Sequence, residues 1–120
     1  MGMTNPTTPT RSRLPHHNLI AYHVAVELLI AVKEAKIRDA KLRDEATRAA
    51  KSACLNIAEG AGRVTRPDKA RAFAIARGET VEAVAAVEIA TTMGDADPND
   101  MKRCISIAER LVALLTGLIR

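Results

Sequence analysis

The chain carries almost no aromatic side chains, and this restricts the folds it can adopt. Tyr22 and Phe73 are its only aromatic residues and it has no Trp, yet 48% of its residues are hydrophobic. A core built from these residues must consist of Ala, Val, Ile and Leu, and such a core favours closely packed helices over a β-sandwich. The length of 120 residues fits one domain. The sequence therefore predicts a single small all-α domain.

Glycine, proline and aspartate residues divide most of the chain into four runs with helical periodicity. The expected helices cover residues 18–36, 39–59, 66–92 and 99 to near the C-terminus. We expect Asn18 and Asn99 to be N-caps, and we expect glycine C-caps at Gly60 with Gly62 and at Gly94. Because the links between the runs are short, the sequence predicts an antiparallel, up-down four-helix bundle.

The first residues have a different composition. Pro6, Pro9 and Pro15 stand there among Thr, Asn and Ser. Such a segment buries little apolar area and interrupts helices. We therefore predict a disordered N-terminal tail over residues 1–16 and a four-helix bundle domain over residues 17–120.

Two of the expected helices are more apolar than one bundle face requires. The first has apolar residues around its whole circumference, and the third carries them on two sides. In a domain of this size, the second apolar layer is expected to belong to a neighbouring subunit. The sequence thus predicts a homo-oligomer.

One segment resembles the hallmark of a known family. Residues 48–63 read Arg-Ala-Ala-Lys-Ser-Ala-Cys-Leu-Asn-Ile-Ala-Glu-Gly-Ala-Gly-Arg, and the block 73–78, with Glu82 after it, resembles a second family motif. These residues resemble the bacterial four-helix-bundle family of the ribosomal RNA intervening-sequence protein, over roughly residues 18–119. The departures from the family pattern are Glu45, Ala53, Glu79 and Ala83.

The resemblance implies an antiparallel bundle that commonly assembles as a ring of five, in a family whose members mostly have no assigned activity. One branch is the accessory variability determinant of diversity-generating retroelements. That branch is similar in fold and implies a basic pentamer that binds RNA and partners a reverse transcriptase. The matching motif residues are Asn56, Glu59, Gly60 and Arg77.

These motif residues also have a physical interpretation. Asn56 and Glu59 lie in the last turn of the second expected helix, where an acid is unfavourable against the helix dipole unless a cation pairs with it. Arg63, Arg66 or Arg77 is the expected partner of Glu59. We interpret the motif as structural: its hydrogen bonds would fasten the turn between the second and third helices, with direct ligand contact as the alternative.

Charge is the main functional clue. The net charge is +4 and the pI is near 9.4. Residues 33–77 hold twelve basic and six acidic side chains, whereas residues 78–101 hold six acidic and no basic ones. This order opposes the dipole of the third helix, so local helix stability does not explain it.

The segregated charge has three interpretations. In the first, a basic surface contacts RNA phosphates, and with so few aromatic residues such binding would be directed at the backbone and sensitive to salt. The candidate RNA-binding residues are Lys41, Arg48, Lys51, Arg63, Arg66, Lys69 and Arg71. In the second, basic and acidic edges meet between subunits of a structural or adaptor ring that binds a protein partner. The third is an ordinary solvated surface.

Enzymatic chemistry is not indicated. The Glu-x-x-His pairs of di-iron bundles are absent, and His23 with Glu27 would make only half a metal site. Cys54 and Cys104 lie in apolar helical patterns and are expected to be reduced, buried side chains of a cytoplasmic protein. The apolar stretch 19–32 is too short and too charged to span a membrane. The sequence predicts a non-catalytic oligomer without cofactor or metal that binds RNA or, alternatively, a protein partner.

Overall fold

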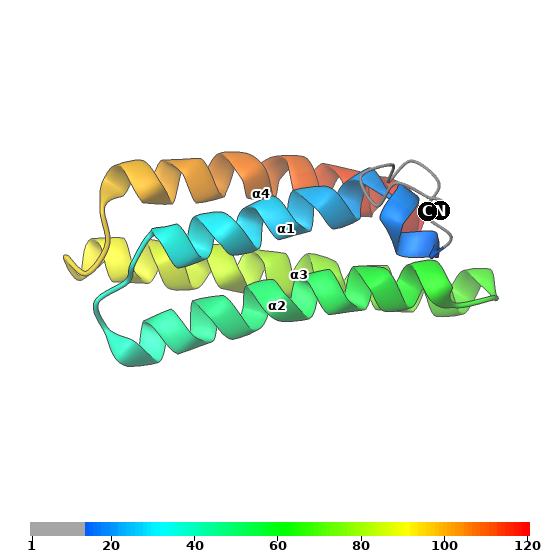
Figure 1. Cartoon of the computed structure of the whole chain (residues 1–120), viewed down its shortest axis with the longest axis horizontal. Helices are drawn as coiled ribbons and strands as arrows, with labels where there is room; N and C mark the ends of the chain where they lie inside the picture. The colour runs from blue at the N-terminus through cyan, green and yellow to red at the C-terminus, as the bar shows by residue number, and fades with distance from the viewer. Residues whose placement is uncertain (1–13) are drawn as a thin grey trace, which may run out of the picture.

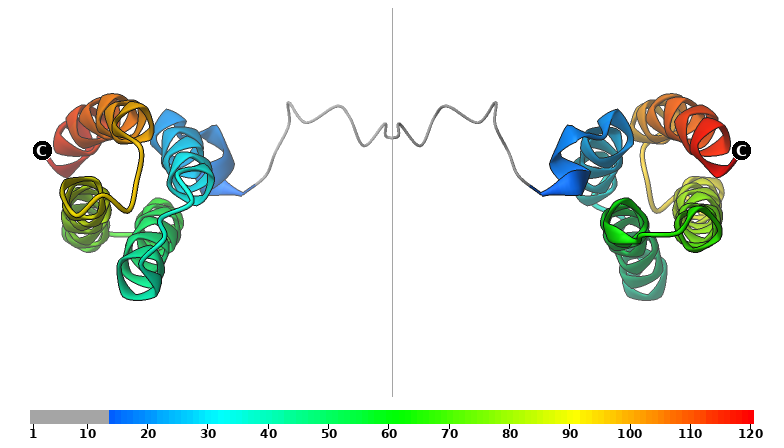
Figure 2. Two further views of the ribbon diagram at one scale, coloured as in Figure 1. Left: turned by 90° about the vertical axis from the view of Figure 1, so that its left-hand side faces the viewer. Right: turned by 90° about the vertical axis from the view of Figure 1, so that its right-hand side faces the viewer.

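The computed structural model describes residues 14–120, which fold as a bundle of four antiparallel helices (Figure 1). The elements are the short 3-10 helix η2 (Pro15–Asn18) and the helices α1 (Ile20–Glu34), α2 (Ala40–Gly62), α3 (Arg66–Thr92) and α4 (Pro98–Ile119). Viewed end-on, helices that follow one another in the chain lie side by side, and α1 lies diagonally across from α3 (Figure 2). The predicted all-α, up-down bundle is confirmed.

Most of the predicted N-terminal tail lies outside the described residues, which begin at residue 14. Pro15 and His16, which the sequence analysis placed in that tail, belong to η2. The helix η2 contacts both α1 and α2. The folded part of the chain therefore starts slightly earlier than expected.

The core is aliphatic and rich in alanine, as the composition predicts. The bulkiest fully buried side chains include Leu28, Ile57, Leu111 and Leu115, and the aromatic ring of Phe73 is also buried. Alanines supply most of the buried residues of α2 and α3, which lie side by side, namely Ala46, Ala49, Ala50 and Ala53 on α2 and Ala72, Ala76, Ala83, Ala86 and Ala90 on α3. Such small side chains let two helix backbones approach closely over a long distance.

Two of the predicted N-caps are wrong. Asp97, not Asn99, caps α4: its Oδ1 accepts a hydrogen bond of 2.7 Å from the backbone N–H of Asn99. The reason is Pro98, which occupies the first helical position, where its missing N–H costs nothing. Asn18 lies within η2, so Leu19 occupies the N-cap position of α1 and makes no side-chain hydrogen bond there.

The glycines at the helix ends behave in two ways. Gly94, with φ of +79°, ends α3 as predicted: its N–H donates to Thr91 O and the N–H of Asp95 donates to Ala90 O, the Schellman arrangement. The predicted C-cap at Gly60 and Gly62 is wrong, because α2 continues through both and ends at Gly62. Gly60 is buried, and a Cβ atom there would lie 2.7 Å from Cε1 of Phe73. Its missing side chain makes room for that ring.

Candidate nucleic-acid interface

The turn between α2 and α3 carries several of the candidate RNA-binding residues. Thr65 caps α3 by accepting a hydrogen bond of 3.3 Å from the N–H of Asp68, and Pro67 stands in the first turn. Because α2 and α3 are antiparallel and joined by residues 63–65 alone, Arg63 and Arg66 are held at one end of the bundle. Local capping therefore fixes where these charges lie.

One hollow lies between α2 and α3 next to this turn, and a second lies along the outside of α2. The first has a volume of about 390 Å³ and is lined by Asn56, Glu59, Arg63, Asp68, Arg71, Ala72 and Ile75. The second has a volume of about 570 Å³ and is lined by Arg43, Asp44, Thr47, Arg48, Lys51, Ser52, Leu55 and Asn56. Since Asn56 lines both, the two hollows adjoin, and together they place Lys51, Arg63 and Arg71 along one stretch of surface.

The candidate basic residues differ in their partners. Within residues 14–120, no carboxylate forms an ion pair with Lys51 or Arg71. Lys69 Nζ donates to the carbonyls of residues 60 and 61, 3.0 Å from the latter, and Arg66 donates to the carbonyl oxygen of Arg120. These two side chains cover free carbonyls at helix ends while their charge stays at the surface.

Lys41 lies apart from the others. It stands in the first turn of α2, whereas Arg63 follows the last turn. At about 1.5 Å of rise per residue, the two positions are about 33 Å apart. The structure therefore does not bring Lys41 together with the residues at the α2–α3 turn.

Arg48 is held by three carboxylates. Its Nη2 lies 2.8 Å from Glu45 and 2.6 Å from Glu82, and its Nη1 lies 3.3 Å from Glu79. The hydrogen bond from Arg48 lowers the pKa of Glu45, while the bonds to Glu45 and Glu79 raise the pKa of Arg48. The sequence predicts Arg48 as an RNA-binding residue and does not reveal its contacts with Glu79 and Glu82, which come from α3. Helical periodicity shows which residues share a face of one helix, but it does not show which residues of two neighbouring helices lie opposite one another.

The four family-motif residues have different roles. Glu59 accepts a hydrogen bond of 2.6 Å from Arg63, one of its three expected partners, and so offsets its unfavourable place near the end of α2. Asn56 does not fasten the turn: its Nδ2 donates to the carbonyl and the hydroxyl of Ser52 within α2. Arg77 donates to Thr116 Oγ1 at 3.0 Å and links α3 to α4. Together with the contact of Gly60 and Phe73, these bonds describe a largely structural motif.

Comparison with known proteins agrees with the motif. A family model described as 23S rRNA-intervening sequence protein matches residues 17–117. The chain belongs to this family. The match covers more than four-fifths of the sequence and includes all four helices almost completely. A search of curated proteins found no match.

In this family member, the side chains considered for catalysis or metal binding have other partners or are buried. His23 Nε2 lies 2.8 Å from the carbonyl oxygen of His17, and Glu27 pairs with Arg110 at 3.2 Å. Burial raises the pKa of the Cys54 and Cys104 thiols to about 11, which disfavours the nucleophilic thiolate. Within residues 14–120, no three His, Cys, Asp or Glu side chains are grouped so as to hold a metal ion. Among the described helices, none is long and apolar enough to cross a bilayer.

Proposed function

We propose that this family member is a non-catalytic homo-oligomer that binds the RNA backbone. The contact would be made by the α2–α3 basic surface, which we define as Lys51, Arg63, Arg66, Lys69 and Arg71. The observation that carries the proposal is that Arg63, Arg66, Lys69 and Arg71 lie at or just after the α2–α3 turn, while Lys51 lines the hollow that adjoins the one beside this turn. Lys51 and Arg71 form no ion pair within the described residues. The family description, which refers to 23S rRNA, supports an RNA context.

The chemistry of the surface favours phosphate over base recognition. Proteins that read unpaired RNA bases usually stack them on aromatic side chains. This chain has two aromatic residues, of which Phe73 is buried and Tyr22 is partly buried against the core on α1. Binding should therefore depend weakly on base sequence and strongly on salt.

We also propose that the oligomer is a ring, with five subunits as the family resemblance implies, and that it works in the cytoplasm. Its free cysteines, Cys54 and Cys104, fit a reducing compartment. A ring would repeat the α2–α3 basic surface around one axis. Repetition raises the avidity for a long polyanion without any new kind of contact.

The alternative function is that of a structural or adaptor ring for a protein partner such as a reverse transcriptase. The observation that favours it is the neutralisation of Arg48 by Glu45, Glu79 and Glu82, with Arg63 paired to Glu59 as well. These bonds reduce the positive charge that is free to meet phosphate. RNA binding remains the proposal because Lys51 and Arg71 keep their charge beside the hollows.

The test compares two lysines of the same helix. Fluorescence anisotropy would follow a labelled, mixed-sequence, single-stranded RNA across a series of NaCl concentrations. We expect Lys51→Gln to weaken binding and to reduce the slope of log affinity against log salt by about 0.7 for the phosphate that the variant no longer neutralises. The control, Lys41→Gln, removes one charge of the same kind at the distant end of α2 and should change binding little.

Two results would overturn the RNA proposal. One is the absence of RNA binding by the wild-type protein at low salt. The other is equal weakening by Lys41→Gln and Lys51→Gln, because it would show that total charge, and not the α2–α3 basic surface, governs the contact. Either result would turn the search toward a protein partner.

A further inference from the structure

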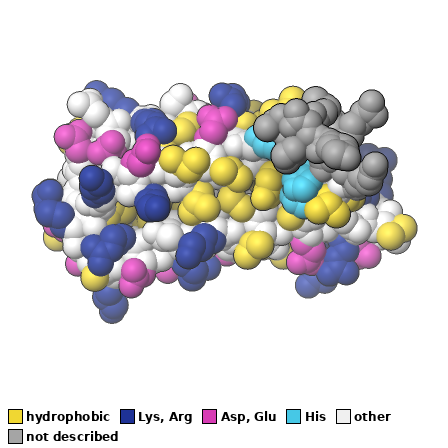
Figure 3. All heavy atoms as spheres, in the orientation of Figure 1, with side chains coloured by type: hydrophobic (Ala, Val, Ile, Leu, Met, Phe, Trp, Pro, Cys, Tyr) yellow, Lys and Arg dark blue, Asp and Glu magenta, His cyan; other side chains and the backbone are white. Residues whose placement is uncertain are grey.

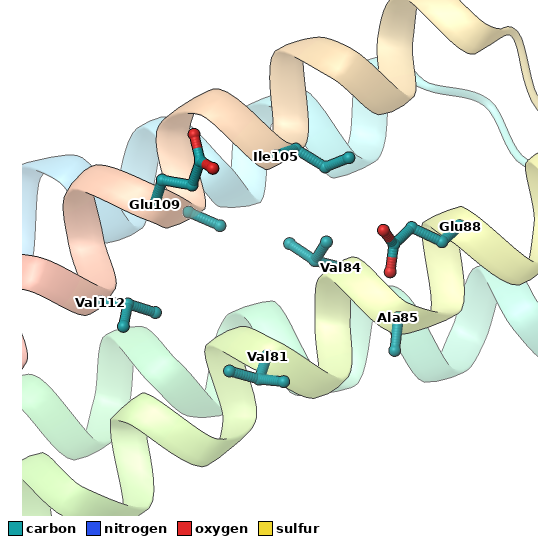
Figure 4. Close-up of a pocket in the computed structure, with 8 residues that line it drawn as sticks. Val81, Val84, Ala85, Glu88, Ile105, Glu109 and Val112 are labelled. Carbon is teal, nitrogen blue, oxygen red and sulfur yellow. The ribbon is translucent and has the colours of Figure 1, made fainter.

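An apolar groove runs between α3 and α4. It has a volume of about 350 Å³, and its floor and walls are formed by Val81, Val84, Ala85, Ile105, Ala108 and Val112 (Figure 4). We call it the α3–α4 groove. Val81 is 53% exposed and Ile89, one turn beyond Ala85, is 52% exposed. Contiguous exposed apolar surface of this kind is unfavourable in water and usually marks a site that a partner covers.

Two carboxylates flank the groove. Glu88 on α3 and Glu109 on α4 complete its lining, and Figure 4 shows Val84 and Ile105 between them. Neither forms an ion pair within residues 14–120, whereas Glu27 and Glu34 on α1 each pair with an arginine of α4. The groove therefore suits an occupant that offers apolar side chains with positive charge beside them.

The outer face of α1 has this chemistry. Tyr22, Val26, Leu29 and Ile30 follow one another at helical spacing, and Ile30 is 46% exposed while the others are partly buried. Lys33 and Lys36 follow at the same end of the helix, exposed and without an ion pair to any described carboxylate. We call these six residues the α1 ridge. Figure 3 shows the hydrophobic side chains gathered over α1 on the face toward the viewer.

We propose that the α1 ridge of one copy docks into the α3–α4 groove of a second copy. The apolar residues of the ridge would fill the groove, as ridges of one helix pack into grooves between others, and Lys33 and Lys36 would meet Glu88 and Glu109. The proposal rests on the homo-oligomer of the proposed function and names its contact surfaces.

The geometry of the bundle makes this contact head-to-tail. The ridge lies on α1, whereas the groove lies between α3 and α4, so each copy offers one surface of each kind (Figure 2). Contacts between unlike surfaces leave one of each exposed at the ends of a chain unless the assembly closes into a ring. The α2–α3 basic surface takes no part, so the same copy can assemble and bind RNA.

The first experiment introduces an acid into the ridge. Ile30→Glu would face the carboxylates of the groove, and we expect the dissociation constant of the oligomer to rise about tenfold or more, as for a central apolar contact. Met93→Glu is the matched control, because Met93 is 68% exposed and lies outside both surfaces. Light scattering behind size-exclusion chromatography would give the mass at fixed protein concentrations, and circular dichroism would verify that both variants are helical.

The second experiment exchanges the charges. A ridge variant carries Lys33→Glu and Lys36→Glu, and a groove variant carries Glu88→Lys and Glu109→Lys. Each alone should dissociate, because like charges then face one another. A mixture of the two should associate again, because the altered ridge fits the altered groove and the unaltered ridge fits the unaltered groove. Since the two variants must then alternate, the mixture should give dimers, chains or even-numbered rings, and no ring of five. An interface that used other surfaces would not be restored in this way.

The outcomes separate this inference from the proposed function. An oligomeric wild type that keeps its mass in Ile30→Glu, or altered variants that do not reassemble on mixing, would overturn the ridge and groove and leave the oligomer standing. A wild type that stays monomeric at every concentration would overturn both. RNA binding, measured by anisotropy on the monomeric Ile30→Glu variant, reports on the α2–α3 basic surface independently.

Discussion

Gly60→Ala is expected to destabilise the protein, although alanine is the better helix former. Gly60 lies within α2, is buried, and has a backbone conformation open to alanine, since its φ is not positive. A Cβ atom at this position would lie 2.7, 2.8 and 3.1 Å from Cε1, Cδ1 and Cζ of Phe73. Real Cβ atoms essentially never approach an aromatic carbon to 2.7 Å, so the Phe73 ring or the α2–α3 spacing must change.

Two opposing effects decide the magnitude. Replacing glycine by alanine inside a helix stabilises the folded state by up to about 1 kcal/mol. Forcing an extra methyl group into a close-packed core costs about 1–3 kcal/mol. Phe73 is only 4% exposed and stiff, and it packs where the two helix backbones are close, so the upper half of that range applies. We expect a net loss of about 1–2 kcal/mol in the free energy of unfolding.

Gly62→Ala is the matched control, because Gly62 also lies in α2 and no atom comes within 4 Å of the Cβ position. Urea unfolding followed by circular dichroism at one protein concentration would compare both variants with the wild type. Gly62→Ala should be neutral or stabilised. In the Gly60→Ala background, Phe73→Leu should cost less than in the wild type, since the shorter side chain relieves the clash. Equal stability of the Gly60→Ala and Gly62→Ala proteins would refute this reasoning.

Three further predictions concern single interactions. Asp97→Ala should cost about 1 kcal/mol of unfolding free energy through loss of the α4 cap, whereas Asn99→Ala should change it by less than about 0.5 kcal/mol; the reverse order would show that Asn99 is the cap. Arg48→Ala should lower the urea midpoint at low salt, and the difference in midpoint from the wild type should shrink at about 1 M NaCl. The difference should also shrink as the pH falls below about 4.5, because Glu45, whose pKa Arg48 lowers in the folded protein, then becomes protonated and its ion pair no longer favours folding. Burial raises the pKa of Cys54 and Cys104 from 9.0 to about 11, so the free energy of unfolding should fall as the pH rises from 9 to 11. Alkylation of these thiols at about pH 8 should be slower in the folded protein than in urea, and equal rates would contradict thiol burial.

The helices and their order could be predicted because each depends on local information. The periodicity of apolar residues gives a helix its buried face, and glycine or proline ends it. Gly94 is an instance: only glycine adopts its φ of +79° without strain, so a glycine after the apolar run predicts the end of α3. The near absence of aromatic residues likewise predicted a core of small aliphatic side chains, which the buried alanines, valines, isoleucines and leucines confirm.

The errors concern residues whose role depends on a partner far along the chain. A glycine near the end of a helical pattern is usually a C-cap, but Gly60 is needed because Phe73 packs against it from the next helix. Arg48 is exposed on α2, as its spacing predicts, but that spacing does not show that Glu79 and Glu82 reach it from α3. Asn56 was expected to fasten a turn and bonds within its own helix instead. Sequence spacing within one helix carries no information on these cross-helix contacts.

The segregated charges of the sequence thus fall into two groups: those that pair with one another within the folded chain, and those that have no partner within the described residues. Glu79 and Glu82, the first acidic residues of the segment 78–101, bind Arg48 in the middle of α2. Ion pairs between the two helices therefore explain part of the charge that opposes the dipole of α3. Beyond that point, Glu88 has no cation to meet within the described residues, and Lys51, one turn after Arg48 on α2, has no anion there. Pairing within the folded chain explains only the first group, Arg48 with its carboxylate partners. The second group is exposed on two different surfaces, so a partner that neutralises Glu88 need not be the one that neutralises Lys51. This separation is why assembly and RNA binding are proposed as independent properties of one bundle.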